Sequence, residues 1–221
     1  ASKSACPSPD DYMKSFEGAD NIVVVTITGT LSGSYNSAEI AKKIYLEEHP
    51  DTKIHVIDSL SAGGEVDLLV RKLNHLVAEG LEFDQVLDAI TAYQAKTKLL
   101  FVLAKVDNLV KNGRLSKLVG TVVGLLNIRM VGEASKTGTL ELLQKARGQK
   151  KAIKAAFDEL IKAGYTGGHI TIAHRNNDKF IEQFSELVRE KFAQASIEVL
   201  PTSGLCSFYA EEGGLLMGYE I

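Results

Sequence analysis

Hydrophobic positions near the start of the chain change from a continuous run to a helical spacing. Residues 21–28 (NIVVVTIT) are rich in Val, Ile and Thr and nearly free of charge, which is typical of a parallel strand covered on both faces. From Tyr35 to Tyr45, apolar residues recur at the spacing of one helix face. Ser32 is the expected N-cap, because its hydroxyl can accept a hydrogen bond from the first turn. The pattern predicts a strand-to-helix unit.

A second unit of the same kind follows. Residues 53–58 (KIHVID) predict a strand, and apolar stripes predict helices over residues 66–77 and from Phe83 onward. Turns of small and polar residues, 29–34 and 59–64, follow the two strands. Open α/β sheets bind ligands at the carboxyl ends of their strands, so these two turns are expected to line one crevice.

From Lys98 the pattern becomes a mixture of shorter elements. The expected strands are residues 99–103, 128–133, 139–143, 169–174 and 196–201, and the expected helices are a short one ending near Gly113, 149–163 and 178–194. An apolar stretch, 115–126, is a candidate for a further helix. The chain is therefore expected to be α/β, with a Rossmann-like parallel-sheet domain over residues 1–95 and an α+β domain with a mixed sheet over residues 96–221.

Composition narrows the classes of function. The 221 residues carry a formal net charge of −3, which argues against a nucleic-acid surface. The chain has no apolar run of the length that a membrane helix needs, so no membrane insertion is expected. Two cysteines and five histidines lack metal-ligand spacing, so no metal site is expected. A polar N-terminal segment and thiols interpreted as reduced predict a cytoplasmic protein.

The first turn carries the candidate binding groups. Four hydroxyl side chains gather at the end of the first strand: Thr28, Thr30, Ser32 and Ser34. The amides of Gly33 and Ser34 lie at the start of the helix, and backbone N–H groups at a helix N-terminus bind carboxylates and phosphates. The turn is therefore either an anion site or only the cap that any strand-to-helix unit needs.

Five short motifs occur in a fixed order along the chain. They are SACPSP (4–9), TITGTLSGSYNSA (26–38), VIDS (56–59), VDNLVKNGRLS (106–116) and ARGQKKAI (146–153). In that order they resemble TSQPSP, ISSxLSGTYxSA, VIDS, DxLxxLxxGGRIS and RGxKKAI of the DegV family, bacterial two-domain lipid-binding proteins. The resemblance extends over essentially the whole chain.

The resemblance implies a fatty-acid-binding carrier and not an enzyme. One long-chain fatty acid would lie between the two domains, with no cofactor and no catalytic residue. The family's pattern places the carboxylate at the Ser/Thr-rich turn, with Arg114 as the neighbouring cation. Ala210 stands where the family has a head-group histidine, so Tyr209 is a candidate substitute. The expected ligand-binding set is Ser4, Thr28, Thr30, Ser32, Gly33, Ser34, Arg114, Tyr209 and Ala210.

The resemblance also implies a partner, because several family members present the fatty acid to a separate kinase. The basic segment from Lys145 to Lys154 is either a solvated face or a docking patch for an acidic kinase surface, with Arg147 as the partner-binding candidate. The apolar stretch 115–126 is either core or a wall of the acyl-chain pocket. The chain begins almost at the first motif, where the family has a preceding strand and helix, so we expect a longer natural chain or an exposed edge that favours self-association.

Two other classes of function remain open. A small-molecule hydrolase or phosphoryl-transfer enzyme could use the same crevice, although the sequence has no GxSxG elbow, no P-loop and no histidine within the serine motifs. An interaction module without ligand is favoured by Ala210 and by the shortened start. Lipid extracted from the purified protein would separate these classes from a carrier.

Overall fold

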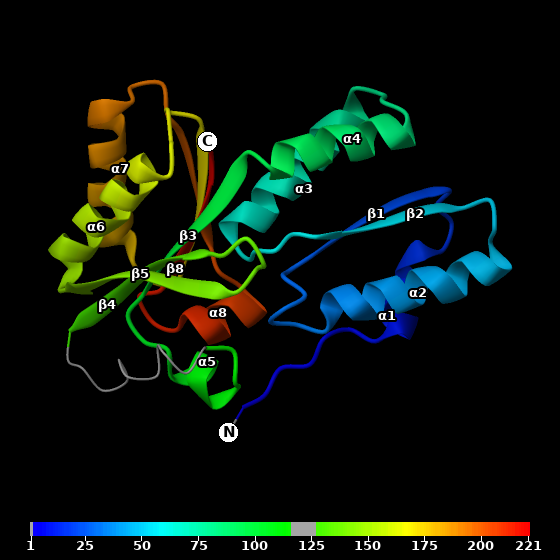
Figure 1. Cartoon of the computed structure of the whole chain (residues 1–221), viewed down its shortest axis with the longest axis horizontal. Helices are drawn as coiled ribbons and strands as arrows, with labels where there is room; N and C mark the ends of the chain where they lie inside the picture. Colours follow the sequence, from blue (N-terminus) through cyan, green and yellow to red (C-terminus); the bar gives the residue numbers. More distant parts are fainter. Residues whose placement is uncertain (1, 116–126) are drawn as a thin grey trace.

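The computed structural model describes residues 2–115 and 127–221. In this part of the chain the strands form two sheets, a small parallel one and a larger mixed one, which Figure 1 shows side by side. The small sheet pairs β1 (Asn21–Thr26) with β2 (Lys53–Asp58). The large sheet has the strand order β5-β4-β3-β8-β6-β7. The predicted α/β class is confirmed.

Helices cover both faces of the small sheet. On one face, α1 (Pro9–Phe16) and α2 (Ser34–Glu48) pack through Phe16 and Ala41 against Ile54 of β2. On the other face, α3 (Gly64–Ala78) and α4 (Phe83–Gln94) bury Ile57. The faces alternate along the strands because successive side chains of a strand point to opposite sides.

Two expectations for the first unit are wrong. Strand β1 is not fully covered, because Ile22 to Val25 are only half-buried and an apolar groove lined by Val23 and Val25 runs beside them. The N-cap of α2 is Gly33, not Ser32, and it makes no side-chain capping bond. The Ser32 hydroxyl instead accepts a hydrogen bond from the Ser34 amide at 3.2 Å. Ser34 is the first residue of α2, whereas a capping side chain accepts from the amide of the second or third residue.

The large sheet consists of six strands in its described part. They are β3 (Thr97–Leu103), β4 (Ile128–Ala134), β5 (Leu140–Arg147), β6 (His169–His174), β7 (Ser196–Pro201) and β8 (Leu215–Glu220). One face is covered by α6 (Gln149–Lys162) and α7 (Asp178–Lys191), which lie together at the left of Figure 1. Leu100 and Val102 of β3 face these helices, whereas Leu99, Phe101 and Leu103 face the opposite side. That opposite side carries α5 (Asp107–Lys111) and α8 (Gly204–Ala210).

Three elements were not predicted: α1, α8 and β8. Strand β8 is central, because it pairs antiparallel with β3 on one side and with β6 on the other. The helix predicted over 115–126 lies, apart from Leu115, outside the described residues. No helix of residues 2–115 and 127–221 is long and apolar enough to cross a membrane.

Helix α3 connects the two sheets. It packs on β8 and β6 of the large sheet as well as on β1 of the small one. Its first turn carries Glu65, which is 6% exposed and accepts a 2.8 Å hydrogen bond from the Thr97 hydroxyl of β3. Burial raises the pKa of the Glu65 carboxyl, because desolvation penalises its charged form. The junction between the sheets therefore contains a carboxyl group that stays protonated to a higher pH than an exposed glutamate does.

We predict that the stability of Glu65→Gln relative to the parent protein increases as pH rises above about 4.5, the ordinary pKa of a glutamate. A carboxyl whose folded pKa lies above the unfolded value contributes most stability below the unfolded pKa, and loses that contribution as pH rises through the folded one. Urea titrations at several pH values measure the difference, with Glu47→Gln at an exposed position of α2 as the control. Stability curves that stay parallel for Glu65→Gln would contradict the prediction.

Candidate functional site

A cavity of about 590 Å³ opens between the two sheets, within the range of small-molecule sites in proteins. It is bounded by the N-terminal segment, by the loops that follow β1 and β2, by strands β3 and β8, and by α8. The main described lining residues are Ser4, Cys6, Ile27, Thr28, Leu31, Ser32, Gly33, Ser34, Ala62, Phe101, Leu103, Leu109, Arg114, Leu140, Leu205, Cys206, Tyr209, Ala210 and Leu216.

One wall of the cavity is apolar. Phe101 and Leu103 project from β3 and Leu216 projects from β8, all from the face that α6 and α7 leave uncovered. Leu109 of α5 and Leu140 of β5 extend the wall. These residues provide the apolar wall in the described chain, and the predicted stretch 115–126 lies, apart from Leu115, outside the described residues. The sheet supplies this wall because alternate residues of each strand point to the same side.

The polar side of the cavity joins distant parts of the chain. The hydroxyl of Ser4 lies 2.7 Å from that of Tyr209. The guanidinium of Arg114 lies over the Tyr209 ring, 5.2 Å from its centroid, and its Nε donates to the Leu31 carbonyl at 2.9 Å. Its Nη1 donates to the Asn112 carbonyl at 3.0 Å. Tertiary contacts thus fix one cation and two hydroxyls beside the apolar wall.

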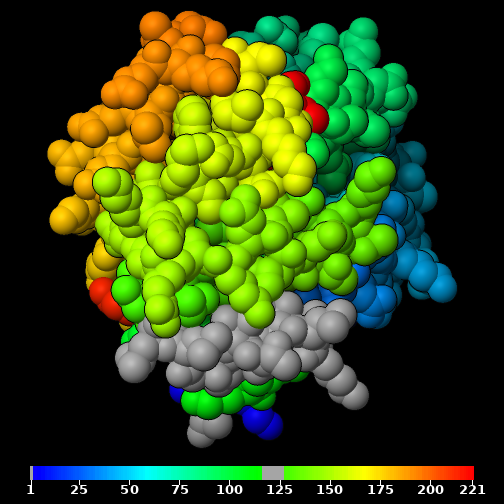
Figure 2. All heavy atoms as spheres, turned by 60° about the vertical axis from the view of Figure 1, so that its left-hand side comes forward, coloured from blue at the N-terminus to red at the C-terminus, as the bar shows by residue number. Residues whose placement is uncertain are grey.

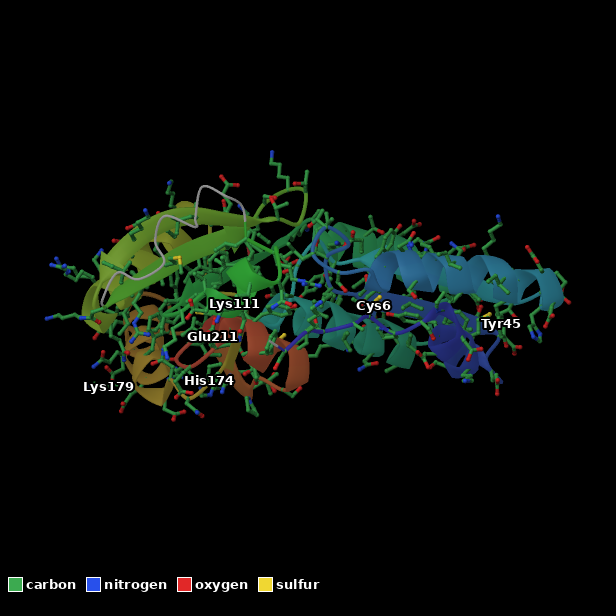
Figure 3. The ribbon with its side chains drawn as sticks, turned by 90° about the horizontal axis from the view of Figure 1, so that it is seen from below. Cys6, Tyr45, Lys111, His174, Lys179 and Glu211 are labelled. Atoms are coloured by element: carbon green, nitrogen blue, oxygen red, sulfur yellow. The ribbon has the colours of Figure 1, made fainter. Side chains whose placement is uncertain are left out.

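The predicted Ser/Gly turn also lies at the cavity. The hydroxyls of Ser32 and Ser34 are 2.9 Å apart. A Cβ added to Gly33 would come within 2.9 Å of Cys6 Sγ, so a larger residue there would push the N-terminal segment away. Figure 3 places Cys6 in that segment, between the two sheets. Ala62 brings the second predicted turn to the same cavity, which confirms that the two turns line one crevice.

Thr28 and Thr30 are placed differently from the other hydroxyls. Thr28 is 3% exposed and lines the cavity, but its hydroxyl donates to the Gly138 carbonyl at 2.9 Å. Thr30 does not line the cavity, and its hydroxyl donates to the same carbonyl at 2.7 Å. The structure therefore separates Thr30 from the rest of the expected ligand set, because the β4–β5 turn occupies its hydroxyl.

The remaining predicted residues divide between the cavity and the surface. Ala210 is buried and lines the cavity, so it supplies a methyl group where the family pattern has a histidine. Arg147 lies at the end of β5, exposed and outside the cavity lining. Among the described residues, no group of three or more His, Cys, Asp or Glu side chains is placed to hold a metal ion.

Sequence reasoning missed both thiols of the cavity. Cys6 and Cys206 are free cysteines and both line it. Burial raises the pKa of the Cys206 thiol, so its neutral, apolar form is favoured. Cys206 could have been found only by predicting α8, because this helix brings Leu205, Cys206 and Tyr209 to the cavity together.

Known proteins resemble this chain over its full length. A family model described as "Uncharacterised protein, DegV family" matches residues 1–219. A DegV domain-containing protein of Streptococcus pneumoniae is 78% identical over 221 residues, which are 100% of this chain and 79% of that protein.

Solved structures agree with the sequence matches. The crystal structure of the Streptococcus pneumoniae Fatty Acid Kinase (Fak) B3 protein loaded with linoleic acid has a TM-score of 0.98 and 78% identity, and the match covers 100% of this chain and 79% of that one. A DegV family protein from Eubacterium eligens loaded with heptadecanoic acid has a TM-score of 0.93 and 40% identity, with 98% and 78% covered. With its motif order, its two sheets and the matches to sequence and structure, the chain belongs to the DegV family.

Proposed function

We propose that this protein is a fatty-acid-binding carrier that holds one long-chain fatty acid in the cavity between its sheets. The observation that carries the proposal is the cavity itself, an apolar wall from β3 and β8 facing one cation and several hydroxyls. Burying about fifteen methylenes at about 0.8 kcal/mol each contributes at most about 12 kcal/mol before ordering costs. The fatty acids bound by the Streptococcus pneumoniae and Eubacterium eligens relatives support this ligand class.

The carboxylate, in this proposal, lies among Ser4, Tyr209, Arg114 and the Ser32–Ser34 turn. A buried carboxylate is costly unless it is hydrogen-bonded and its charge is compensated. The Ser4 and Tyr209 hydroxyls, 2.7 Å apart, and the nearby guanidinium of Arg114 meet both needs. The two sheets support the division into domains over residues 1–95 and 96–221, with the ligand between them.

A kinase is the partner that we propose. The Streptococcus pneumoniae relative is named as a protein of the fatty acid kinase, which supports a carrier that presents its ligand for phosphorylation. Arg147 is exposed beside the exposed lysines of α6, Lys150, Lys151 and Lys154. Figure 2 shows α6 and the β4–β5 hairpin on one continuous face. An acidic kinase surface fits this face. A cytoplasmic location is part of the proposal, supported by the two free thiols.

The test is the lipid content of the purified protein. We expect denaturation and solvent extraction to release about one fatty acid per chain, identified by mass spectrometry. Ala62→Phe, which places a ring in the cavity, should retain less than half as much lipid, whereas Ala78→Phe, at an exposed position near the end of α3, should retain the normal amount. Absence of fatty acid in the extract, together with no binding of added fatty acid, would overturn the proposal.

A further inference from the structure

The tip of the β4–β5 hairpin contacts the loop that follows β1. The Thr28 and Thr30 hydroxyls both donate to the Gly138 carbonyl, at 2.9 Å and 2.7 Å, and the two hydroxyl oxygens are 2.9 Å apart. We call this contact the Gly138 clasp. It joins residues more than 100 positions apart, one from the large sheet and two from the loop of the small sheet.

The clasp is closely packed. Gly138 has φ +77°, and an added Cβ would lie 2.1 Å from the Thr28 hydroxyl oxygen and 3.0 Å from Leu60 Cα. The turn that presents the carbonyl is held internally, because the Gly138 amide donates to the Ser135 carbonyl at 2.9 Å and the Ser135 hydroxyl lies 2.7 Å from that of Thr139. Only glycine fits here without displacing the hairpin.

The clasp occupies the two threonine hydroxyls. Each hydroxyl has one proton to donate. Either both protons point to the Gly138 carbonyl, or one hydroxyl donates to the other, which in turn donates to that carbonyl. In each of these arrangements no proton remains for a ligand carboxylate. The two threonines therefore have a role in joining the β1 loop to the tip of the hairpin.

The position of the clasp beside the cavity indicates what this contact does. Leu31 follows Thr30 in the chain, Leu140 lies two residues after Gly138, and both leucines line the cavity. The Leu31 carbonyl also accepts the hydrogen bond from Arg114. The same loop is thus held by the hairpin and by Arg114, and it bounds the cavity together with Leu140 of the hairpin.

We propose that the Gly138 clasp is the closure that sets the rate of fatty-acid exchange, with Thr30 as a positioning residue that does not touch the ligand. This inference rests on the proposed function. Separating the hairpin from the β1 loop breaks the hydrogen bonds to Gly138 and moves Leu31 away from Leu140, which opens the cavity between the sheets. A weaker clasp opens more often, so ligand both enters and leaves faster, while the equilibrium affinity changes less than either rate.

Thr30→Val tests the inference, because it removes a clasp hydroxyl without altering the cavity lining. Loss of one neutral hydrogen bond predicts about 2- to 10-fold faster transfer of a fluorescent fatty acid to excess acceptor vesicles, with a similar increase in the loading rate. Thr91→Val is the matched control, because the Thr91 hydroxyl also donates to a backbone carbonyl, at 2.8 Å, on an exposed face of α4. Gly138→Ala, which displaces the hairpin, should accelerate release further.

The outcomes separate this inference from the function on which it rests. If the parent protein binds no fatty acid, the proposed function fails. If the parent protein binds fatty acid and Thr30→Val releases the fatty acid at the parent rate, only the inference that the clasp sets the exchange rate fails. Equal acceleration by Thr30→Val and Thr91→Val would assign the effect to general stability and would also overturn the clasp. Should Gly138→Ala not fold, the comparison of Thr30→Val with Thr91→Val still decides.

Discussion

Replacing Arg114 with alanine is expected to weaken fatty-acid binding by about 1.5–3 kcal/mol, the range for a hydrogen bond to a charged group. Arg114 is half-buried at the cavity, and its guanidinium lies 5.2 Å from the centre of the Tyr209 ring. A carboxylate beside it gains a charge-assisted hydrogen bond, which is stronger than one between neutral groups. Isothermal titration of delipidated protein with a long-chain fatty acid measures the loss.

An uncharged analogue of the fatty acid provides the control for this prediction. Arg114 also donates to the Leu31 carbonyl, so its removal affects the cavity wall as well as the head group. A fatty alcohol of the same length depends on the wall but carries no charge. We expect Arg114→Ala to weaken the acid far more than the alcohol, and Arg114→Lys to restore part of the difference by restoring the charge. Equal losses for acid and alcohol, or no loss for the acid, would remove Arg114 from the carboxylate site.

Gly64→Ala is expected to destabilise the protein by about 3 kcal/mol, at the upper end of the usual cost of overpacking. An added Cβ at Gly64 would lie 2.2 Å from the Thr171 carbonyl oxygen, 2.6 Å from the Gly218 amide nitrogen and 3.0 Å from the Leu216 carbonyl oxygen. All three are backbone atoms of paired strands, which cannot rotate away as a side chain can. Helix α3 would have to move off the large sheet. Urea denaturation followed by circular dichroism measures the change.

Gly80→Ala separates crowding from backbone strain. Gly80 follows α3 with φ +75°, and a Cβ there would meet no atom within 4 Å. Its substitution is expected to cost about 1–2 kcal/mol through the left-handed backbone alone. If Gly64→Ala is as stable as Gly80→Ala or more stable, α3 can move away from the sheet at little cost, and the prediction is wrong.

The sequence by itself determined the elements whose periodicity is local. Strands β2, β6 and β7 match the predicted residues because short Val- and Ile-rich runs between turn residues fit the pleated, half-buried surface of a sheet, and a short window of sequence contains this pattern. Their alternation with amphipathic helices was sufficient for the α/β class. The order of the motifs was sufficient for the family, although no single motif carries a reaction mechanism.

The tertiary structure decided what depends on distant residues. The residues of β8 (LLMGYE) form the centre of the large sheet only because β3 and β6 pair with both of their edges. The Thr28 and Thr30 hydroxyls find an acceptor in the Gly138 carbonyl, more than 100 residues away, which their local motif does not reveal. Arg114 meets Tyr209 and Leu31 through the same long-range folding. Local spacing defines which groups a segment offers, but hydrogen-bond partners and strand neighbours are chosen by the packing of the whole chain, which no short window of sequence contains.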